Sequence, residues 1–454
     1  NFFKLINQIH FIIITIFLYF GVCMRCFFAF FLAFLFCACA DKASPYATLT
    51  LKQSTSILGA VKDTYQLDDK AYRAKFFAAW HFKGRNLDKK AIFWAFDGYL
   101  NGRYYFFNKQ IIPQNFFTKA ISNANTQAFL TLKQKAIITQ NSFLKNLPVQ
   151  TAILKDPFKQ GEGVPFDYAL DSVLNFGSPV LISHFTLDKK FAFVLSETGW
   201  GFVLAAHLEP LSNAQARHYE NSNFITPLTE RLAVHNERGD FVFEARIGAI
   251  YAYDELSNGR YKGQAGSVSY EISAHNAEPF PLMWSDFNVK ALINELLNRP
   301  YGWGGYDFER DCSALTRDFF AAFGAYLPRN SLAQSEFSGW TRFDISHLNN
   351  EQKLKFIARY AKPYETLLYL KGHIMLFVGV TKGKNAAFHA VWGIRTKDDG
   401  RALIAKSALT TLDIGKNDSG VAKSDLLLSR LESISIYRLS PQEWQRIERA
   451  LSKF

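Results

Sequence analysis

The chain has 454 residues, of which 48% are hydrophobic and 16% aromatic, and its formal net charge is +12 at pH 7. This length is sufficient for several compact domains, and the hydrophobic and aromatic content excludes an intrinsically disordered chain. The positive charge is not concentrated in a dense run of Lys and Arg. We therefore expect an anionic partner other than nucleic acid.

The first 39 residues form an apolar leader. Lys4 and Arg25 are its only charged residues, and small residues close its second apolar stretch. A charged start, a short apolar core and a small-residue end predict a secretory signal, not a spanning helix. Cys39 resembles the acylated cysteine of bacterial lipoproteins, so we expect an exported protein, lipid-anchored at the periplasmic face of a bacterial membrane. One long N-terminal membrane anchor is the alternative, and Met24 is a candidate for the true start.

A helical N-terminal domain is predicted over residues 40–135. Residues 41–65 are small and polar and predict a linker at its start. Apolar residues at spacings of three and four then follow Asp68-Asp69, recur over 91–100, and begin again after Pro113. The aromatic residues on these helices are expected to form core.

Short strand-like runs then alternate with turn residues, a pattern typical of small antiparallel barrels. We place one SH3-like barrel at 136–212 and a second at 213–280. Modules of this kind bind peptide or glycan or act as spacers, and the sequence favours neither. The predicted strands are 180–185, 191–195, 200–203, 231–234, 241–245 and 247–253.

Residues 281–454 predict an α+β domain. A helix over 287–297 precedes the glycine-rich run Tyr301-Gly302-Trp303-Gly304-Gly305, and a second helix begins at Cys312 and ends at Gly324. Two strands are expected downstream, at 374–380 and 386–392.

Cys312 is the only cysteine beyond the leader. At the first turn of a helix, free backbone amides and the helix dipole favour the thiolate, which is the nucleophilic form. The alternative is a buried core cysteine. The residues around Cys312 favour a nucleophile.

Two histidines downstream complete a candidate catalytic set. His373 is the expected base for the thiol, and His389 is the expected partner that orients it. A hairpin centred near Thr381 would place the histidines directly opposite each other, but the turn signal lies near Gly383, so a bulge or wider loop is required. A zinc site of Cys312, His373 and His389 is disfavoured by the wide spacing, and we expect no metal.

The motifs of this domain resemble those of the NlpC/P60 cell-wall cysteine peptidases. The segments that carry the resemblance are Tyr301-Gly302-Trp303-Gly304-Gly305, Asp311-Cys312-Ser313-Ala314-Leu315, Leu327-Pro328-Arg329-Asn330-Ser331 with Gln334, Gly372-His373-Ile374-Met375 and Phe388-His389. The stretch Gly161–Tyr168 is similar to the paired bacterial SH3-like domains of the multidomain branch. The helical region is similar to the N-terminal helper domain of that branch.

The resemblance implies a papain-like fold and a triad of Cys312, His373 and His389 without a cofactor. It implies hydrolysis of the bond between γ-D-glutamate and the diamino acid of peptidoglycan stem peptides by a monomer. It also implies that Asp311 and Ser313 bind a free N-terminal amine and that the hydroxyl of Tyr301 lies near the thiol. A carboxylate beside a hydroxyl suits an ammonium group, although Asp311 can also serve only as the helix cap.

Two residues depart from the family pattern, and three others stay ambiguous. Arg310 replaces a usual aromatic residue and Ala314 a usual glycine. Phe166, in the first barrel, is either a wall of the pocket or barrel core, as are its neighbours Asp167 and Tyr168.

Two other functions remain open. One is a cell-wall-binding lipoprotein that has lost catalysis, to which the barrels and the positive charge point. The other is an amidase or acyltransferase with the same Cys-His chemistry. In each case the expected partners are cell wall and, through the anchor or the N-terminal segment, the membrane.

Overall fold

The computed structural model describes residues 46–84 and 87–453. The leader, with the predicted lipid site Cys39, lies outside the described residues. Within the described part of the chain, no helix is long and apolar enough to cross a membrane. The described chain forms helices, then two β domains, then an α+β domain, which confirms the predicted fold class.

Residues 46–65, which the sequence predicts to be linker, pack along the C-terminal domain. Tyr65 pairs with Trp284 through the backbone, and the Gln53 side chain donates to the carbonyl of Leu409 at 2.8 Å. The segment contains only one short turn, η1 (Thr55–Ile57). Apart from this turn, the segment is neither helix nor sheet but an extended chain that packs on a distant domain, so its sequence shows no periodic apolar pattern.

The helical segment is made of short elements. They are α2 (Lys70–Phe76), η2 (Ala78–His81), α3 (Lys89–Ile92), α4 (Ala95–Asn101), α5 (Gln114–Asn123) and η3 (Thr126–Ala128). The helix expected to run through Trp80 ends at Phe76, and a 3-10 turn follows. This turn directs the Trp80 indole N–H at the carbonyls of Ala136 and Val180, at 3.1 and 3.0 Å.

The first β domain, called barrel 1 here, is a seven-stranded antiparallel sheet in the order β3-β2-β6-β5-β4-β1-β7. A buried ion pair between Lys145 and Asp167 (3.0 Å) ties a long loop to it. Helices α4 and α5 cover its Phe193 and Phe202. Its strands are β1 (Gln134–Ile138), β2 (Ser142–Lys145), β3 (Leu170–Leu174), β4 (Pro179–Phe185), β5 (Phe191–Ser196), β6 (Gly199–Leu204) and β7 (Leu208–Pro210), with η4 (Ala205–His207).

The second β domain, barrel 2, has a five-stranded sheet, β10-β9-β14-β13-β12, and a three-stranded sheet, β11-β8-β15. Stacked Phe176 and Phe243 join its core to barrel 1, with ring centroids 4.0 Å apart. Its elements are α6 (Asn213–Glu220), β8 (Asn223–Pro227), β9 (Leu232–His235), β10 (Phe241–Ala245), β11 (Tyr251–Tyr253), β12 (Glu255–Ser257), β13 (Arg260–Ala265), β14 (Val268–Ser273) and β15 (Ala277–Pro279).

The C-terminal domain is built on a six-stranded antiparallel sheet, β16-β21-β17-β18-β19-β20. Helix α8 packs on β18, with Leu315 and Phe319 in one core with Ile374. Its elements are α7 (Asp286–Leu296), η5 (Trp303–Phe308), α8 (Cys312–Ala322), α9 (Ser331–Ser335), β16 (Trp340–Asp344), α10 (Asn350–Tyr360), β17 (Thr366–Leu370), β18 (His373–Thr381), β19 (Lys384–Arg395), β20 (Arg401–Thr411), η6 (Lys423–Asp425), α11 (Leu427–Arg430), β21 (Leu431–Tyr437) and α12 (Pro441–Leu451).

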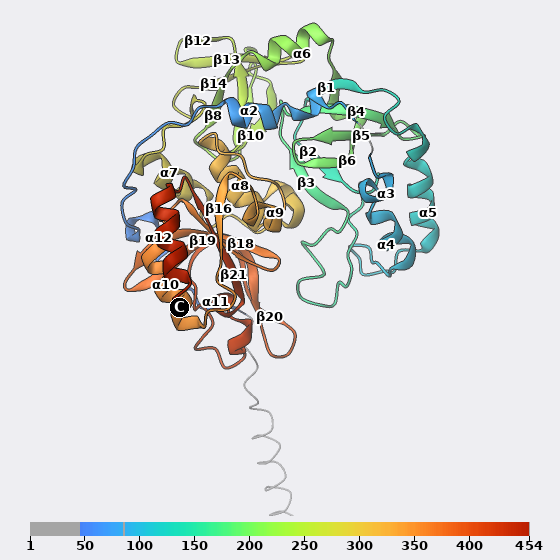
Figure 1. Ribbon diagram of the computed structural model, residues 1–454. Helices are drawn as coiled ribbons and strands as arrows, with labels where there is room; N and C mark the ends of the chain where they lie inside the picture. Colours follow the sequence, from blue (N-terminus) through green and yellow to red (C-terminus); the bar gives the residue numbers. More distant parts are fainter. Residues whose placement is uncertain (1–45, 85–86, 454) are drawn as a thin grey trace, which may run out of the picture.

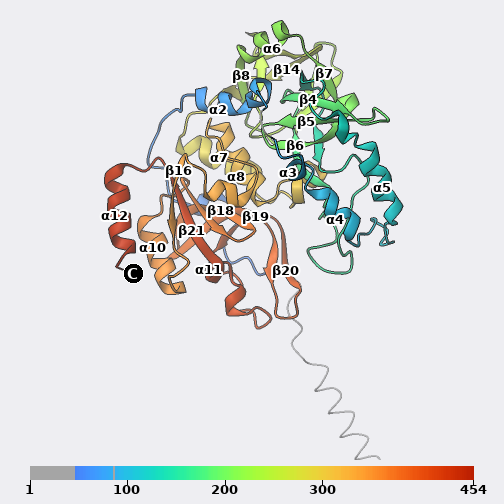
Figure 2. The same cartoon turned by 45° about the vertical axis from the view of Figure 1, so that its right-hand side comes forward.

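The arrangement brings three regions together around α8. In Figure 1 the two barrels lie above the C-terminal domain, with α8 directly beneath them. Figure 2 shows the same order, with α5 along the outer side of barrel 1 and α3 on the side that faces the C-terminal domain. The start of α8 therefore lies where the helical segment, barrel 1 and the C-terminal domain meet.

Candidate active site

Cys312 is the first residue of α8 and is 7% exposed. Asp311 is the N-cap, and its carboxylate accepts a hydrogen bond from the Ala314 amide at 2.9 Å. Burial, followed by the negative charge of Asp311, raises the pKa of Cys312 to about 12, although backbone hydrogen bonds from Ile374 and Ser313 act in the opposite direction. The resting group is thus a thiol, whereas the helix N-terminus alone predicts a thiolate. Burial outweighs the dipole here.

His373 and His389 form a hydrogen-bonded chain that ends on a threonine. His373 Nε2 lies 2.7 Å from His389 Nδ1, and His389 Nε2 lies 2.8 Å from the hydroxyl of Thr410 on β20. Burial, and then the charge of Arg430, lower the pKa of His373 to about 4. Burial, and then the proximity of His373, hold the pKa of His389 well below its usual range. Both rings are therefore neutral at rest.

The hairpin contains the bulge that the turn signal near Gly383 predicts, but it does not place the two histidines directly opposite each other. Thr381 pairs with Lys384, and a bulge between Phe377 and Gly379 leads to the pair Leu376–Phe388. If this register continues, the residue of β19 that lies opposite His373 is two positions beyond His389. Residues on such a diagonal share one face and are within reach of long side chains, so the rings still meet.

Asp311 does not stand free in the site, because Arg329 binds it. The two guanidinium N–H groups donate to the two carboxylate oxygens at 2.9 and 2.6 Å, and one also donates to the Ser313 hydroxyl at 2.8 Å. Burial alone would raise the pKa of Asp311, but Arg329 and the amides of Ala314 and Gly304 hold it below its usual range. Asp311 is thus ionised and its charge is balanced by Arg329.

Cys312 opens onto a cleft of about 730 Å³ that three regions of the chain line. The C-terminal domain contributes Trp303, Arg329 and Gly372 beside the cysteine. Across from them, barrel 1 and the helical segment supply the other walls, which include Asp171, Ser172, Thr198, Trp200, Ala91, Ile92 and Trp94. Trp94 is 63% exposed at this cleft. The cleft is therefore a composite of domains that the sequence presents as separate.

Tyr301 is partly buried and lines the same cleft as the cysteine. Burial, and then the charges of Cys312 and Asp311, hold its pKa well above the usual range, so it stays protonated. Its ring centroid lies 6.0 Å from that of Phe166 and 5.9 Å from that of Trp392. Tyr301 therefore lines the cleft as a neutral phenol within an aromatic cluster.

The three residues of barrel 1 that the sequence left ambiguous divide between two roles. Phe166 packs on Trp303, with centroids 5.1 Å apart, and so contacts the C-terminal domain. Tyr168 also lies over Trp303, at 6.2 Å. Asp167 is structural, since it pairs with Lys145 and accepts hydrogen bonds from the amides of Ile153 and Ala169 at 2.9 and 3.0 Å.

The glycine-rich run allows barrel 1 to approach the cysteine helix. Gly304 and Gly305 have φ angles of 61° and 98°, in the region that favours glycine. A Cβ atom on Gly304 would lie 2.4 Å from the carbonyl oxygen of Leu170, and one on Gly305 would lie 2.4 Å from Val173. Backbone contact between this loop and β3 is therefore possible only without side chains at these positions.

Several residues of the site had no assigned role in the sequence analysis. Arg329 belonged to a quoted motif, but Asp171, Ser172 and Thr410 carried no local signal, because each is an ordinary strand residue. Asp171 accepts a hydrogen bond from the Asn146 side chain at 3.0 Å, and burial raises its pKa to about 6. Among the described residues, no group of three or more His, Cys, Asp and Glu side chains could hold a metal ion.

Comparisons with family models match each part of the chain. The matches are an NLPC_P60 stabilising domain (N term) over 28–129, an SH3 domain of the SH3b1 type over 153–204, an SH3 domain of the SH3b2 type over 212–257, and the NlpC/P60 family over 298–400. A search of curated proteins found no match.

A search of solved structures found chains that are similar to this one. An NlpC/P60 endopeptidase from Photobacterium damselae subsp. piscicida has 21% sequence identity and a TM-score of 0.74, with 87% of this chain and 98% of that chain covered. An NlpC/P60 family protein from Bacillus cereus ATCC 10987 has 14% identity and a TM-score of 0.45, with 66% and 98% covered. The first shares the fold across most of the chain. Together, the family matches along the chain and the arrangement of its domains show that this protein belongs to the NlpC/P60 family, in a multidomain form with an N-terminal stabilising domain and two SH3-type domains.

Proposed function

We propose that the protein is a cysteine endopeptidase that hydrolyses the γ-D-glutamyl–diamino acid bond of peptidoglycan stem peptides. The observation that carries the proposal is the combination of Cys312 at the mouth of the composite cleft with the chain His373–His389–Thr410 on the adjoining strands. The family membership of the chain supports a peptidase of this type.

Because both histidines are neutral, each ring carries one N–H proton, and the hydrogen bonds between the rings and to Thr410 determine on which nitrogen that proton lies. If His389 donates from Nε2 to Thr410 and accepts at Nδ1, then His373 must donate from Nε2. The Nδ1 atom of His373 then carries a lone pair and is the base that takes the proton of Cys312. His389 and Thr410 hold this tautomer in place.

Catalysis then follows in two balanced steps. The Cys312 thiolate attacks the γ-carbonyl carbon, the C–N bond breaks, and His373 gives its proton to the leaving amine. The resulting thioester is hydrolysed by a water molecule whose proton His373 accepts and returns to the sulfur. Backbone hydrogen bonds from Ile374 and Ser313 to the sulfur stabilise the thiolate as it forms.

Recognition of the substrate amine involves carboxylates on both sides of the cleft. Asp311 and Ser313 remain the predicted amine site, but both already accept hydrogen bonds from Arg329. Asp171 of barrel 1 also lines the cleft; it accepts a hydrogen bond from the neutral amide of Asn146, and Arg329 acts on it through charge without a direct hydrogen bond among the described residues. We therefore add Asp171 as the carboxylate whose charge is available to an ammonium group.

The decisive experiment compares the purified protein with Cys312→Ala on stem peptides. Mass spectrometry of the products identifies the bond that is cut, and cleavage at any other bond would favour an amidase or acyltransferase. Equal activity of the two proteins, or no cleavage of any muropeptide, would contradict the proposal. Binding to sacculi without release of peptide would favour a wall-binding lipoprotein.

We also propose export and lipid anchoring through Cys39, on the leader composition alone. The expected result is a fatty-acylated protein in the membrane fraction of the native host. Cys39→Ser should release the protein from that fraction, and an unchanged distribution would contradict the anchor.

A further inference from the structure

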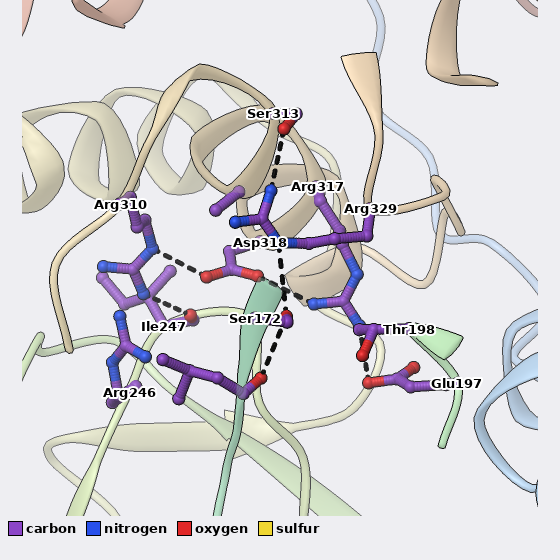
Figure 3. Close-up of polar contacts among 12 residues, drawn as sticks. Ser172, Glu197, Thr198, Arg246, Ile247, Arg310, Ser313, Arg317, Asp318 and Arg329 are labelled. Carbon is purple, nitrogen blue, oxygen red and sulfur yellow. Dashed lines mark hydrogen bonds and ion pairs between the residues drawn. The ribbon is translucent and has the colours of Figure 1, made fainter. Parts of the chain in front are cut away.

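A buried network of charged side chains joins both barrels to helix α8. In Figure 3, Asp318 lies between Arg310 and Arg317, and Arg317 reaches Glu197 of barrel 1. On the other side, Arg310 reaches barrel 2, where Glu230 is fully buried. Buried charges of this kind are costly unless each is paired, so such a network implies that the relative placement of the domains is fixed.

Arg310 makes most of the contacts in this network. Its guanidinium donates to both carboxylate oxygens of Glu230, at 2.7 and 3.0 Å, to the Ile247 carbonyl at 2.8 Å, and to Asp318 at 2.7 Å. Arg246 also faces Glu230, at 3.5 Å. Burial alone would raise the pKa of Glu230, but Arg310 and Arg246 hold it at about 2, so it is ionised.

The same residue lies two positions before the nucleophile. The Arg310 carbonyl accepts from the Gly302 amide at 3.1 Å, and the adjacent Asp311 accepts from the Gly304 amide at 3.0 Å. The segment that leads into Cys312 is thus held from one side by the glycine-rich loop. Arg329 binds Asp311 on the cleft side, and toward barrel 2 the segment is held by the Arg310 side chain and by an ion pair of Glu309 with Arg231.

Barrel 2 does not line the cleft. Its side-chain links to the segment before Cys312 are the buried pair of Glu230 with Arg310 and a more exposed ion pair of Arg231 with Glu309 at 3.4 Å, and neither lines the cleft. A close backbone approach supports these links, since a Cβ atom on Gly248 of barrel 2 would lie 2.5 Å from the Cα atom of Asp318.

We propose that Arg310 is a positioning residue, through which Glu230 of barrel 2 fixes the segment that carries Cys312 and so sets the rate of the chemical step. The proposal rests on the proposed peptidase function. It requires that a change in barrel 2, outside the cleft, lowers kcat and leaves KM nearly unchanged. A role limited to stability would lower the melting temperature without this split.

The principal test is Glu230→Asp in the full chain, which keeps the charge and shortens the side chain. We expect kcat on stem peptide to fall about tenfold or more, because small misplacements of reacting groups have effects of this size, with KM within about twofold. The matched control is Glu237→Asp, a barrel 2 carboxylate in an exposed pair with Lys262 at 2.9 Å, which should leave kcat unchanged. An unchanged kcat in Glu230→Asp, or a rise in KM alone, would overturn the proposal.

Alkylation of Cys312 by iodoacetamide gives a second measurement that needs no substrate. Followed by peptide mapping below the melting temperature, its rate should fall in Glu230→Asp, whereas partial unfolding would raise it. If the wild-type protein cleaves no peptide, the peptidase proposal fails, and this rate still tests the positioning role. An unchanged or faster rate in the variant would count against it.

A second variant, Arg310→Lys, keeps the positive charge but loses the two-pronged contact with the carboxylate. It should show the same fall in kcat and in alkylation rate. If Arg310→Lys folds with wild-type kcat, or if neither variant folds, Arg310 acts only in stability and the proposal is wrong.

Discussion

Barrel 1 and barrel 2 follow one another in sequence, but they relate differently to the nucleophile. Barrel 1 lines the cleft directly with Asp171, Ser172 and Trp200. Barrel 2 contributes no cleft residue and instead pairs its buried Glu230 with Arg310, next to the cysteine helix. Two modules with similar strand patterns can therefore serve one site in different ways, one through its surface and one through a buried contact.

The comparison also gives a role to Arg310, at a position where the family resemblance predicts an aromatic residue. An aromatic residue at this position could not bind Glu230 and Asp318 at once, whereas a guanidinium can. An arginine at this position is unexplained when the catalytic domain is considered alone. Its contact with Glu230 explains it when barrel 2 is included.

The largest expected effect lies in neither barrel. His373→Ala removes the proposed base and should lower kcat by about 10²–10⁴-fold, measured by release of the diamino-acid fragment. The matched control is His347→Ala, an exposed histidine of the same domain, which should retain wild-type kcat. A loss smaller than that of Glu230→Asp would show that domain placement matters more than the base.

The next effect concerns the backbone contact of barrel 1. Gly304→Ala adds an atom 2.4 Å from the Leu170 carbonyl oxygen at a φ of 61°, so it should lower the free energy of unfolding by more than ~2 kcal/mol and raise KM. Gly259→Ala in barrel 2 is the control, because its φ is 72° but no atom lies within 4 Å. That variant should cost only ~1–2 kcal/mol. Equal losses in denaturant melts would show that the contact with β3 contributes nothing.

A smaller effect is expected from the charge that barrel 1 places in the cleft. Asp171→Asn should raise KM about tenfold for a stem peptide with a free amine, since hydrogen bonds between charged groups contribute ~1.5 kcal/mol or more. The N-acetylated peptide should show no such change. Asp188→Asn, in a barrel 1 turn outside the cleft, is the control. Equal sensitivity of both peptides would assign the amine to Asp311 and Ser313 alone.

The smallest effect is a difference in pH dependence. Asp171, whose pKa is raised by burial to about 6, becomes neutral as the pH falls through that value and loses its attraction for an ammonium group. His373, whose pKa is lowered by burial to about 4, becomes protonated only below that value and then cannot accept the thiol proton. In the wild type, kcat/KM for the amine-bearing peptide should therefore begin to fall near pH 6.

For Asp171→Asn, or for the acetylated peptide, the fall in kcat/KM should begin only near pH 4. An acid limb near pH 6 in all three cases would contradict the assignment to Asp171 and point to another titrating group.

Local patterns predicted much of the fold. The cap at Asp311, the end of α8 just before Gly324 and the hairpin turn near Gly383 all follow from short-range rules for helix ends and turns. The linker over 46–65 and the helix through Trp80 were less well predicted. In both places the conformation is determined by packing against a domain distant in sequence.

The sequence by itself determined the residues on which the proposed chemistry depends, namely one cysteine at a helix start, two histidines on adjoining strands, and a glycine-rich loop before them. These features are local, so their motifs can be recognised in the sequence without knowledge of the neighbouring domains. Only the tertiary structure decided the protonation of Cys312, the diagonal register of the histidines and the composite walls of the cleft. Burial, strand register and contacts between barrels depend on residues far apart in the chain, for which no single segment carries a signal.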